Sequence, residues 1–439
     1  MTLTLSRITD RSAMVAVIGL GYVGLPLARA FAEKGFRTLA LDIDAPKIEK
    51  LNAGRSYIDR IPDAAVAELV NAKTLLPSAD FARLKEADAI LICVPTPLTR
   101  QREPDMSYVV KTTESIAAHL RAGQLVVLES TTYPGTTDEL VRPILEKTGL
   151  KSGKDFFLAF SPEREDPGNP NFSVANTAKV VGADGEEALA LTTALYGAIV
   201  PKIVPVAGTA TAEAVKLTEN IFRAVNIALV NELKVVFDAM GIDVWDVIEA
   251  AKTKPFGFMP FYPGPGLGGH CIPIDPFYLS WKAREFDVTT RFIELAGEIN
   301  TAMPHLVIER LAKALDARFS RGIKGARLLL LGLAYKKNVD DTRESPALRL
   351  IELLEERGAA VDYHDPFVPM IPLTRHYGPI AGRASVALTP QAIAGYDAVV
   401  IVTDHDAVDY AAVAQAAKLV VDTRNALRGV AARANIVKA

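Results

Sequence analysis

Residues 14–18 form a short apolar run rich in valine, and a glycine-rich turn, GLGYVG, follows it directly. A helical pattern comes next, so this stretch predicts a strand, a tight turn and a helix. Gly19 would make the turn, Gly21 would admit a pyrophosphate, and Gly24 would let the helix pack closely. This order predicts the first unit of a doubly wound sheet that binds a dinucleotide.

A second predicted strand, residues 37–41, ends in Asp42. The Asp42 carboxylate would accept hydrogen bonds from the adenosine ribose and repel a 2′-phosphate, which predicts NAD rather than NADP. The helix N-terminus would bind the phosphates. We also assign Tyr22, Val23 and Lys47 to the cofactor site. The alternative is a flavodoxin-like turn without a ligand.

Two further apolar runs, residues 89–94 and 125–129, continue the predicted sheet and end in small polar residues. In a doubly wound sheet the carboxyl ends of the strands line the ligand crevice. The residues at these ends are therefore candidate neighbours of the nicotinamide, or else plain helix caps. They are Pro95, Thr96, Thr131 and Thr132.

A dense charge cluster, SPEREDPG, follows the apolar run at residues 156–160. It contains three carboxylates and Arg164. Solvated loop charges are one interpretation. Its position favours a functional one, because the preceding strands already direct their ends to one crevice.

Residues 211–240 predict one long helix, because apolar residues recur at three and four spacing with no internal glycine or proline. A helix of this length usually links two lobes or forms a subunit interface. Lys216 and Asn220 stand one turn apart on one face. Lysine on a mixed face is ordinarily a surface residue, so the pattern alone does not select it.

Residues 262–277, YPGPGLGGHCIPIDPF, predict a loop, because glycine and proline disfavour helix and strand. One of only two cysteines, Cys271, lies here between His270 and Asp275. It is a candidate nucleophile beside a glycine cradle. The alternative is a tight turn with a small buried thiol.

The rest of the chain predicts helices at 278–285 and 292–315, interrupted near Pro304, and then a second βα series from residue 327. The fold class is thus α/β, with two Rossmann-like doubly wound parallel sheets joined by a central helical domain with one long helix. We predict an NAD-binding domain at 1–208, the helical domain at 209–318 and a second Rossmann-like domain at 319–439. Cations at the last strand ends would suit a phosphate: Lys336, Lys337, Arg343 and Arg424.

Composition excludes several classes of protein. A formal charge of −3 gives no basic footprint for nucleic acid. The two cysteines and the histidines show no metal-ligand spacing, so we expect no metal. No apolar run approaches membrane-spanning length, and the start has no signal-peptide pattern, so a cytoplasmic protein is expected.

Five segments occur in a characteristic order: GLGYVGLPLA, SPER, AEAVKLTEN, GPGLGGHCIPIDP and KKNVDDTRESPA. Together they resemble the UDP-sugar 6-dehydrogenases across essentially the whole chain. HCIPIDPFYL and SPEREDPGN resemble the branch that acts on UDP-N-acetylglucosamine; UDP-glucose or UDP-N-acetylmannosamine is the alternative. The resemblance implies oxidation of the C6 alcohol to a carboxylate with two NAD⁺, in polysaccharide biosynthesis. It also implies a homodimer or higher homo-oligomer built on the long helix.

The resemblance assigns chemical roles. Cys271 would form a thiohemiacetal and then a thioester, and Lys216 and Asn220 would stabilise the oxyanions. Asp275 would orient or deprotonate the hydrolytic water. Thr131 would bind that water or the sugar.

One departure concerns the acidic loop. Glu163 matches the first glutamate of the UDP-glucose branch and keeps an acid–base role. The second glutamate has no certain counterpart, with Glu165 and Asp166 as candidates. His270 replaces a serine of that branch, and its role is open.

The resemblance also implies the binding residues. Lys337 and Arg424 would bind UDP, and Arg343 would reach the cofactor. The substrate set is completed by Arg164, Gly264, Gly266, Gly268, Gly269 and His270.

Two other functions compete. A β-hydroxyacid dehydrogenase shares the first lobe and a Lys/Asn helix, but it needs no cysteine and lacks the last lobe. A non-catalytic protein that binds NAD or a sugar nucleotide would have no use for a reactive thiol.

Overall fold

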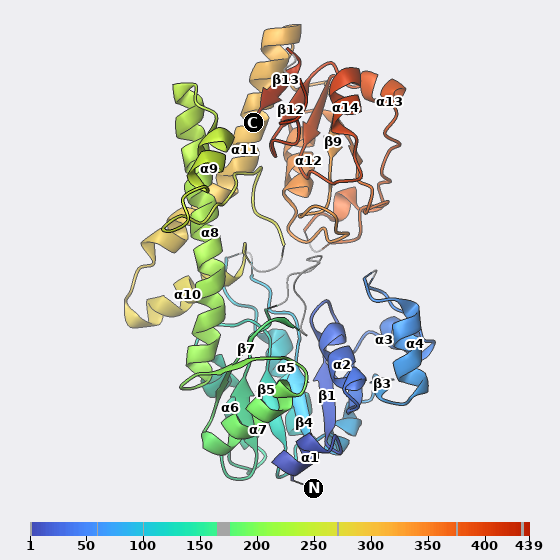
Figure 1. Cartoon of the computed structure of the whole chain (residues 1–439), viewed down its shortest axis with the longest axis vertical. Helices are drawn as coiled ribbons and strands as arrows, with labels where there is room; N and C mark the ends of the chain where they lie inside the picture. Colours follow the sequence, from blue (N-terminus) through green and yellow to red (C-terminus); the bar gives the residue numbers. More distant parts are fainter. Residues whose placement is uncertain are drawn as a thin grey trace. The chain divides into compact units, whose positions relative to one another are not determined.

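The computed structural model comprises two compact units, and each has its own sheet (Figure 1). One unit consists of Met1–Glu219 with Phe277–Val288, and the other of Asn220–Pro276 with Thr289–Ala439. The three domain bounds drawn from the sequence remain a prediction. The structure describes residues 2–58, 60–99, 101–164, 176–269, 272–374, 376–431 and 434–439.

The first unit has an eight-stranded sheet in the order β3-β2-β1-β4-β5-β6-β7-β8. All neighbouring strands are parallel except β6 and β7, which are antiparallel. The first six strands follow the order of a dinucleotide-binding fold, so the predicted fold class is confirmed. The strands are β1 (Met14–Ile18), β2 (Arg37–Leu41), β3 (Leu75–Ser78), β4 (Ala89–Ile92), β5 (Leu125–Leu128), β6 (Phe157–Phe160), β7 (Lys179–Ala183) and β8 (Ile203–Pro205).

Helices cover both faces of this sheet. Val15 and Val17 of β1 belong to one apolar core with helix α2, and Ala16 and Ile18 belong to another with helix α5. Burial on both faces explains why the strands are continuous apolar runs. The helices are α1 (Leu5–Thr9), α2 (Gly24–Glu33), α3 (Ala45–Asn52), α4 (Asp63–Asn71), α5 (Ser107–Ala117), α6 (Arg142–Glu146) and α7 (Glu186–Gly197), with shorter turns η1 (Phe81–Glu86) and η2 (Thr137–Val141).

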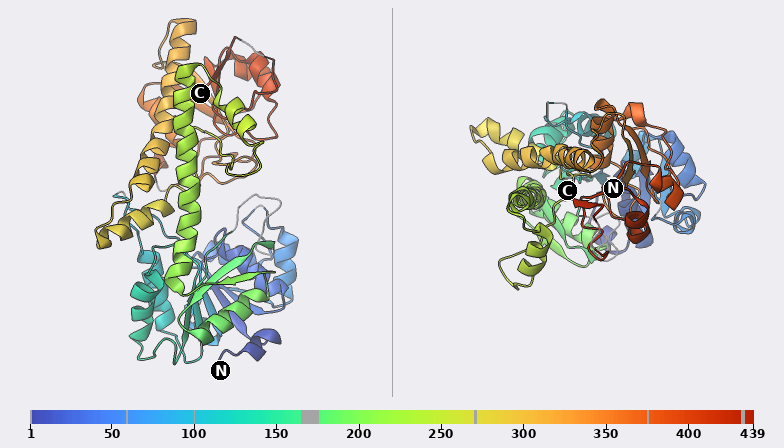
Figure 2. Two further views of the ribbon diagram at one scale, coloured as in Figure 1. Left: turned by 60° about the vertical axis from the view of Figure 1, so that its left-hand side comes forward. Right: turned by 90° about the horizontal axis from the view of Figure 1, so that it is seen from above.

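Helix α8 (Thr209–Met240) runs without interruption for 32 residues (Figure 2). It begins two residues before the predicted start. It belongs to the first unit up to Glu219 and to the second unit from Asn220. The absence of internal glycine and proline lets one helix serve both units.

The predicted helix interruption near Pro304 is wrong. Pro304 lies buried inside the continuous helix α11 (Arg291–Phe319). Proline removes one intrahelical hydrogen bond and disfavours the preceding turn. Here that turn is fixed to α8: the Asn300 side chain donates to the Ala224 carbonyl at 3.0 Å and accepts from Asn231 at 2.8 Å. Tertiary contacts therefore override the local preference. The predicted loop also ends early, because α10 (Asp275–Ala283) starts at Asp275; η4 (Arg284–Phe286) follows it.

The second unit has a five-stranded parallel sheet in the order β10-β9-β11-β12-β13. Leu328 and Leu330 face a core with α11 and α12, while Leu329 and Leu331 face a core with α13 and α14. The elements are α9 (Val244–Ala251), β9 (Arg327–Leu331), α12 (Pro346–Glu356), β10 (Ala360–His364), η5 (Gly378–Ile380), α13 (Pro390–Ala394), β11 (Ala398–Ile401), α14 (Tyr410–Ala416), β12 (Val420–Asp422) and β13 (Ile436–Lys438).

The second sheet has, after β9, a glycine turn like the one that follows β1 in the first sheet. Gly332 follows β9 with φ +86°, and a Cβ there would lie 2.4 Å from the Thr403 carbonyl oxygen. Asp365 follows β10 and accepts from the Leu333 N–H at 2.6 Å. His405 donates to the same carboxylate at 3.0 Å. The repeat marks the last lobe as Rossmann-like.

Within the residues that the structure describes, no helix combines the length and apolar composition that a membrane span requires.

Candidate active site

The glycines of the first turn have different structural roles. Gly19 has φ +90°, and a Cβ would lie 2.6 Å from the Cys93 carbonyl oxygen. A Cβ on Gly24 would lie 1.8 Å from the Gly19 carbonyl oxygen. A Cβ on Gly21 would meet nothing within 4 Å. The chain itself thus requires Gly19 and Gly24, whereas Gly21 leaves space for a ligand.

Asp42 directly follows β2, and its side chain is hydrogen-bonded to this turn. Its carboxylate accepts from the Leu20 N–H at 2.8 Å and from the Asp44 N–H at 2.9 Å. The Lys47 ammonium lies 3.9 Å from it. Tyr22 and Val23 precede the N-terminus of α2, where free N–H groups attract phosphate. Open space at Gly21 beside these groups fits the pyrophosphate and ribose of a dinucleotide.

The loop after β5 carries Thr131 and Thr132. The Thr96 hydroxyl, after β4, donates to the Thr131 carbonyl at 2.7 Å, so Thr96 joins two loops. Pro95 precedes it in the loop after β4. The Thr132 hydroxyl is buried and has no hydrogen-bond partner among the described residues. An unpaired buried hydroxyl at the carboxyl end of the sheet fits a bound polar group, such as that of a nicotinamide.

Glu213 of α8 anchors this loop, and the sequence interpretation missed it. Its carboxylate accepts from the Gly135 N–H at 2.6 Å, from the Thr137 N–H at 2.9 Å and from the Thr137 hydroxyl at 2.6 Å. Burial raises the pKa of Glu213 to about 7 despite these bonds. Its place in AEAVKLTEN, one turn before Lys216, was the only available signal.

Glu213 should make stability pH-dependent. Because its pKa is about 7 in the folded state against 4.5 normally, the folded state binds the proton more tightly. The resulting stabilisation, about 3 kcal/mol, is full below pH 4.5 and is lost as the pH rises through 7. We expect the thermal midpoint of the wild type to fall relative to Glu213→Gln between pH 5 and pH 8. A pH-independent difference between the two proteins would contradict this assignment.

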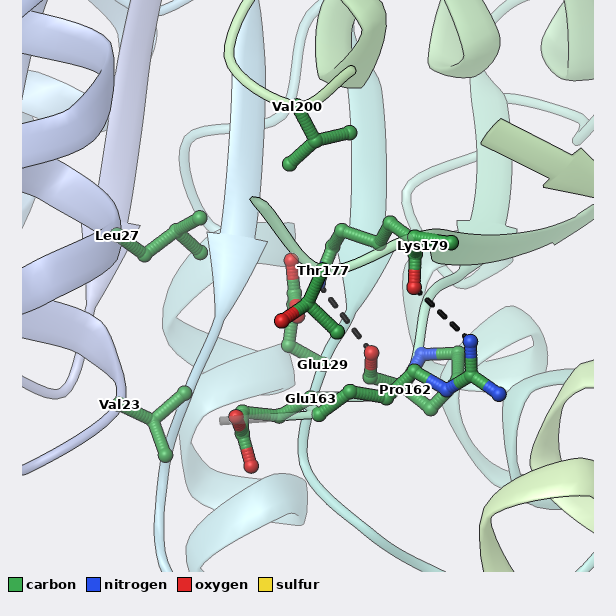
Figure 3. Close-up of a pocket in the computed structure, with 10 residues that line it drawn as sticks. Val23, Leu27, Glu129, Pro162, Glu163, Thr177, Lys179 and Val200 are labelled. Atoms are coloured by element: carbon green, nitrogen blue, oxygen red, sulfur yellow. Dashed lines mark hydrogen bonds and ion pairs between the residues drawn. The ribbon is translucent and has the colours of Figure 1, made fainter. Parts of the chain in front are cut away.

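Lys216 and Glu163 form an ion pair in the first unit, with side chains that are 7% and 14% exposed. The Lys216 ammonium donates to the Glu163 carbonyl at 2.6 Å and lies 3.8 Å from its carboxylate. Burial raises the pKa of Glu163, while Lys216 and Lys179 oppose that rise. Glu163 lines a small cavity with Glu129 and Lys179 (Figure 3). A carboxyl group whose pKa is shifted by burial and by specific charged neighbours is a candidate acid–base group.

Arg164 is engaged within the first unit. It pairs with Glu219 of α8 and donates to the Ala178 carbonyl at 2.9 Å. Its predicted contact with substrate remains a prediction. The candidates Glu165 and Asp166 lie outside the described residues.

Asn220 and Asp275 meet in the second unit. The Asn220 amide donates to the Asp275 carboxylate at 2.6 Å, and both side chains are buried. Asp275 lies in the first turn of α10, where the helix dipole favours a negative charge. Asn220 lies one turn after Lys216 on α8. His270 and Cys271 lie outside the described residues.

The glycine-rich loop packs closely against the last lobe. A Cβ on Gly264 would lie 2.5 Å from the Arg424 guanidinium, and one on Gly268 would lie 2.6 Å from Tyr335. Gly269 has φ +83° and donates to the Arg343 carbonyl at 2.9 Å. These glycines are therefore required by the protein's own packing. Substrate contact by the loop, including Gly266, remains a prediction.

A cavity of about 560 Å³ in the second unit is lined by Lys337 and Arg424, the two residues that are predicted to bind UDP. Lys337 pairs with Asp406 at 2.6 Å. Burial lowers the pKa of Arg424, whose Nε donates to the Val402 carbonyl at 2.8 Å. The buried Asn425 Oδ1 has no hydrogen-bond partner among the described residues. The cavity thus offers cations and a free amide oxygen.

Arg343 forms a two-pronged pair with Asp341, at 3.0 Å and 2.6 Å. Its predicted contact with the cofactor remains a prediction.

Three family domains match this chain in order. Residues 13–200 match the NAD binding domain of the UDP-glucose/GDP-mannose dehydrogenase family, residues 210–302 its central domain and residues 329–429 its UDP binding domain. The fold and site thus define an NAD-dependent nucleotide-sugar dehydrogenase. The chain belongs to the UDP-glucose/GDP-mannose dehydrogenase family.

Relatives within this family carry different substrate names. The chain is 40% identical over 367 residues to a UDP-N-acetyl-D-glucosamine 6-dehydrogenase of Pseudomonas aeruginosa, covering 83% of this chain and 85% of that protein. It is 35% identical to a UDP-N-acetyl-D-mannosamine dehydrogenase of Pyrococcus horikoshii, covering 94% and 96%. A solved structure of the latter kind from P. horikoshii has a TM-score of 0.87 at 34% identity, covering 97% and 98%.

Proposed function

We propose that this chain oxidises the C6 alcohol of UDP-N-acetyl-D-glucosamine to the uronic acid, with two NAD⁺ per sugar. The observation that carries the proposal is the buried Asn220–Asp275 hydrogen bond at the start of the helix that follows Cys271, one turn from Lys216. The P. aeruginosa relative and the HCIPIDP and SPEREDPG segments support N-acetylglucosamine as the sugar.

The reaction divides into two oxidations and a hydrolysis. When bound, NAD⁺ would supply the hydride acceptor for C6 in each oxidation, and the turn at Gly21 with Asp42 would hold it. The first also releases the hydroxyl proton and gives the aldehyde, to which the Cys271 sulfur adds. The second takes the C6 hydrogen and the hydroxyl proton of this thiohemiacetal and gives a thioester. Water then breaks the C–S bond, which releases the carboxylic acid and regenerates the thiol.

The remaining side chains stabilise charge and move protons. The Lys216 ammonium and the Asn220 amide stabilise the alkoxide and tetrahedral oxyanions. Glu163 accepts the released proton, since it lies beside the Lys216 ammonium and burial raises its pKa against the opposing effect of the lysines. Asp275 orients the hydrolytic water, and Thr131 contributes a second hydrogen bond to it.

The NADH yield for each UDP-sugar tests the whole proposal. Two NADH per UDP-N-acetylglucosamine, with far lower efficiency for UDP-glucose, is expected. The P. horikoshii relative supports UDP-N-acetylmannosamine as second candidate, and higher efficiency with that sugar would replace the first. No NADH with any sugar, together with a Cys271 that labels no faster than a buried thiol, would favour a non-catalytic binding protein.

Lys337 and Arg424 are predicted to bind the UDP group. We expect Lys337→Ala and Arg424→Gln each to raise the KM for the UDP-sugar about tenfold, because a charged hydrogen bond to phosphate is lost. The KM for NAD⁺ should change little. Lys418→Ala, an exposed lysine outside the cavity, is the control. An unchanged sugar KM in both variants would refute this role.

We also propose that the protein forms a homodimer through α8. Phe222, Leu229 and Val236 recur every seven residues and are each about half exposed, at 48%, 49% and 46%. Such a stripe needs a partner surface. Leu229→Glu should therefore yield monomers in light scattering after gel filtration. A monomeric wild type would contradict the proposal.

A further inference from the structure

A buried ion pair beside Glu163 has no part in the chemistry proposed above. Lys179 begins β7 and Glu129 follows β5, and their side chains are 10% and 0% exposed. The Lys179 ammonium donates to Glu129 Oε2 at 2.7 Å. The Tyr196 hydroxyl of α7 donates to Glu129 Oε1. The lysine also lies over the Tyr196 ring, 4.8 Å from its centroid.

The same lysine reaches the backbone that carries Glu163. Its ammonium donates to the Pro162 carbonyl at 3.3 Å, and the Lys216 ammonium donates to the next carbonyl, that of Glu163, at 2.6 Å. Two consecutive peptide oxygens are therefore each bound by a buried lysine. The path of the chain at Glu163 depends on both contacts.

Glu129, Pro162, Glu163 and Lys179 line one small cavity together (Figure 3). Its volume is about 30 Å³, so little solvent screens the charges around it. The ionisable groups that act on Glu163 are Lys216 from α8, Lys179 from β7, Glu129 after β5, Arg60 before α4 and Cys93 after β4.

Stability alone does not account for the pair. Removing two charges from water costs several kcal/mol, and apolar replacements of similar volume are often neutral or stabilising. An ion pair retained in such a place needs a further reason. Contact with the Glu163 backbone supplies one.

We propose that Lys179, held by Glu129 and Tyr196, is a positioning residue that fixes the Pro162–Glu163 backbone and, with Glu129, sets the charge state of the Glu163 carboxyl group. The inference rests on the acid–base role given to Glu163 in the proposed function. Lys179 favours the carboxylate, and Glu129 opposes it. The pair thus sets the pH range in which the Glu163 carboxylate can accept a proton.

The test uses opposite charge changes at two neighbouring positions. Loss of the cation in Lys179→Met should move the acidic limb of the kcat–pH profile up by about one pH unit. Loss of the anion in Glu129→Gln should move the acidic limb to lower pH. The double variant should return near the wild-type limb, and Lys179→Arg should retain it. A purely structural pair would lower kcat or the thermal midpoint without opposite shifts.

The outcomes separate this inference from the proposed function. Glu163→Gln with wild-type kcat would refute the acid–base role itself. A Glu163→Gln variant that loses activity, together with limbs that stay fixed or move in the same direction in Lys179→Met and Glu129→Gln, would overturn only this inference. If Lys179→Met does not fold, Glu129→Gln decides alone, because its amide matches the carboxylate in shape; an unshifted limb there overturns the inference.

Discussion

Cys271→Ser is expected to stall the enzyme after the first oxidation. The first hydride transfer needs only a base and a bound cofactor, whereas aldehyde oxidation without the thiol must proceed through a hydrate. Serine is a far less acidic nucleophile, so the hemiacetal that it forms with the aldehyde should form and be oxidised slowly. Fewer than two NADH per sugar should form. Mass spectrometry of the quenched variant should detect a covalent adduct, or product analysis should detect slow aldehyde turnover.

Lys216→Ala is the comparison for this experiment. It removes the positive charge that stabilises the oxyanions and keeps the Cys271 thiol that forms the covalent intermediate. It should therefore slow both oxidations about a hundredfold or more without a stall. The NADH yield should remain two per sugar. A normal rate with full yield in Cys271→Ser would instead mean that Cys271 is an inert thiol.

Gly24→Ala should destabilise the first unit by about 3 kcal/mol or more, because overpacking at rigid backbone cannot relax cheaply. The new Cβ would lie 1.8 Å from the Gly19 carbonyl oxygen. The matched variant is Gly21→Ala, whose Cβ meets no protein atom within 4 Å. It should keep the thermal midpoint and lower NAD⁺ affinity at least about tenfold, since its methyl group occupies the ligand's space.

Thermal unfolding without ligand and NAD⁺ titration by calorimetry distinguish the two effects. Equal stability losses in both variants would contradict the assignment of Gly21 to the ligand. Undiminished stability of Gly24→Ala would contradict the close contact between Gly24 and Gly19.

Elements with strong local signals were predictable from the sequence. The bounds of β1 and β2 agree with the prediction, because parallel strands buried on both faces read as apolar runs. The continuous α11 was not predictable, because the contacts of Asn300 that hold the turn before Pro304 come from α8.

The residues of the candidate site also differ in how far the sequence alone could predict them. The glycine turn and Asp42 follow from local patterns with a known mechanism. Cys271, Asn220 and Asp275 were selected by resemblance to a family. Glu213 and Lys179 escaped notice, because an isolated charge in an apolar stretch gains meaning only through partners distant in sequence.

The repeated turn in the last lobe has a consequence for nucleotide choice. Asp365 already receives the N–H groups of Leu333, Ala334, Phe367 and Val368 and the imidazole of His405. A carboxylate has about four lone-pair positions, so no acceptor remains for sugar hydroxyls. All acceptor positions of the Asp365 carboxylate are thus used by groups of the protein itself, His405 among them. The last lobe must therefore select its nucleotide through cations and amides.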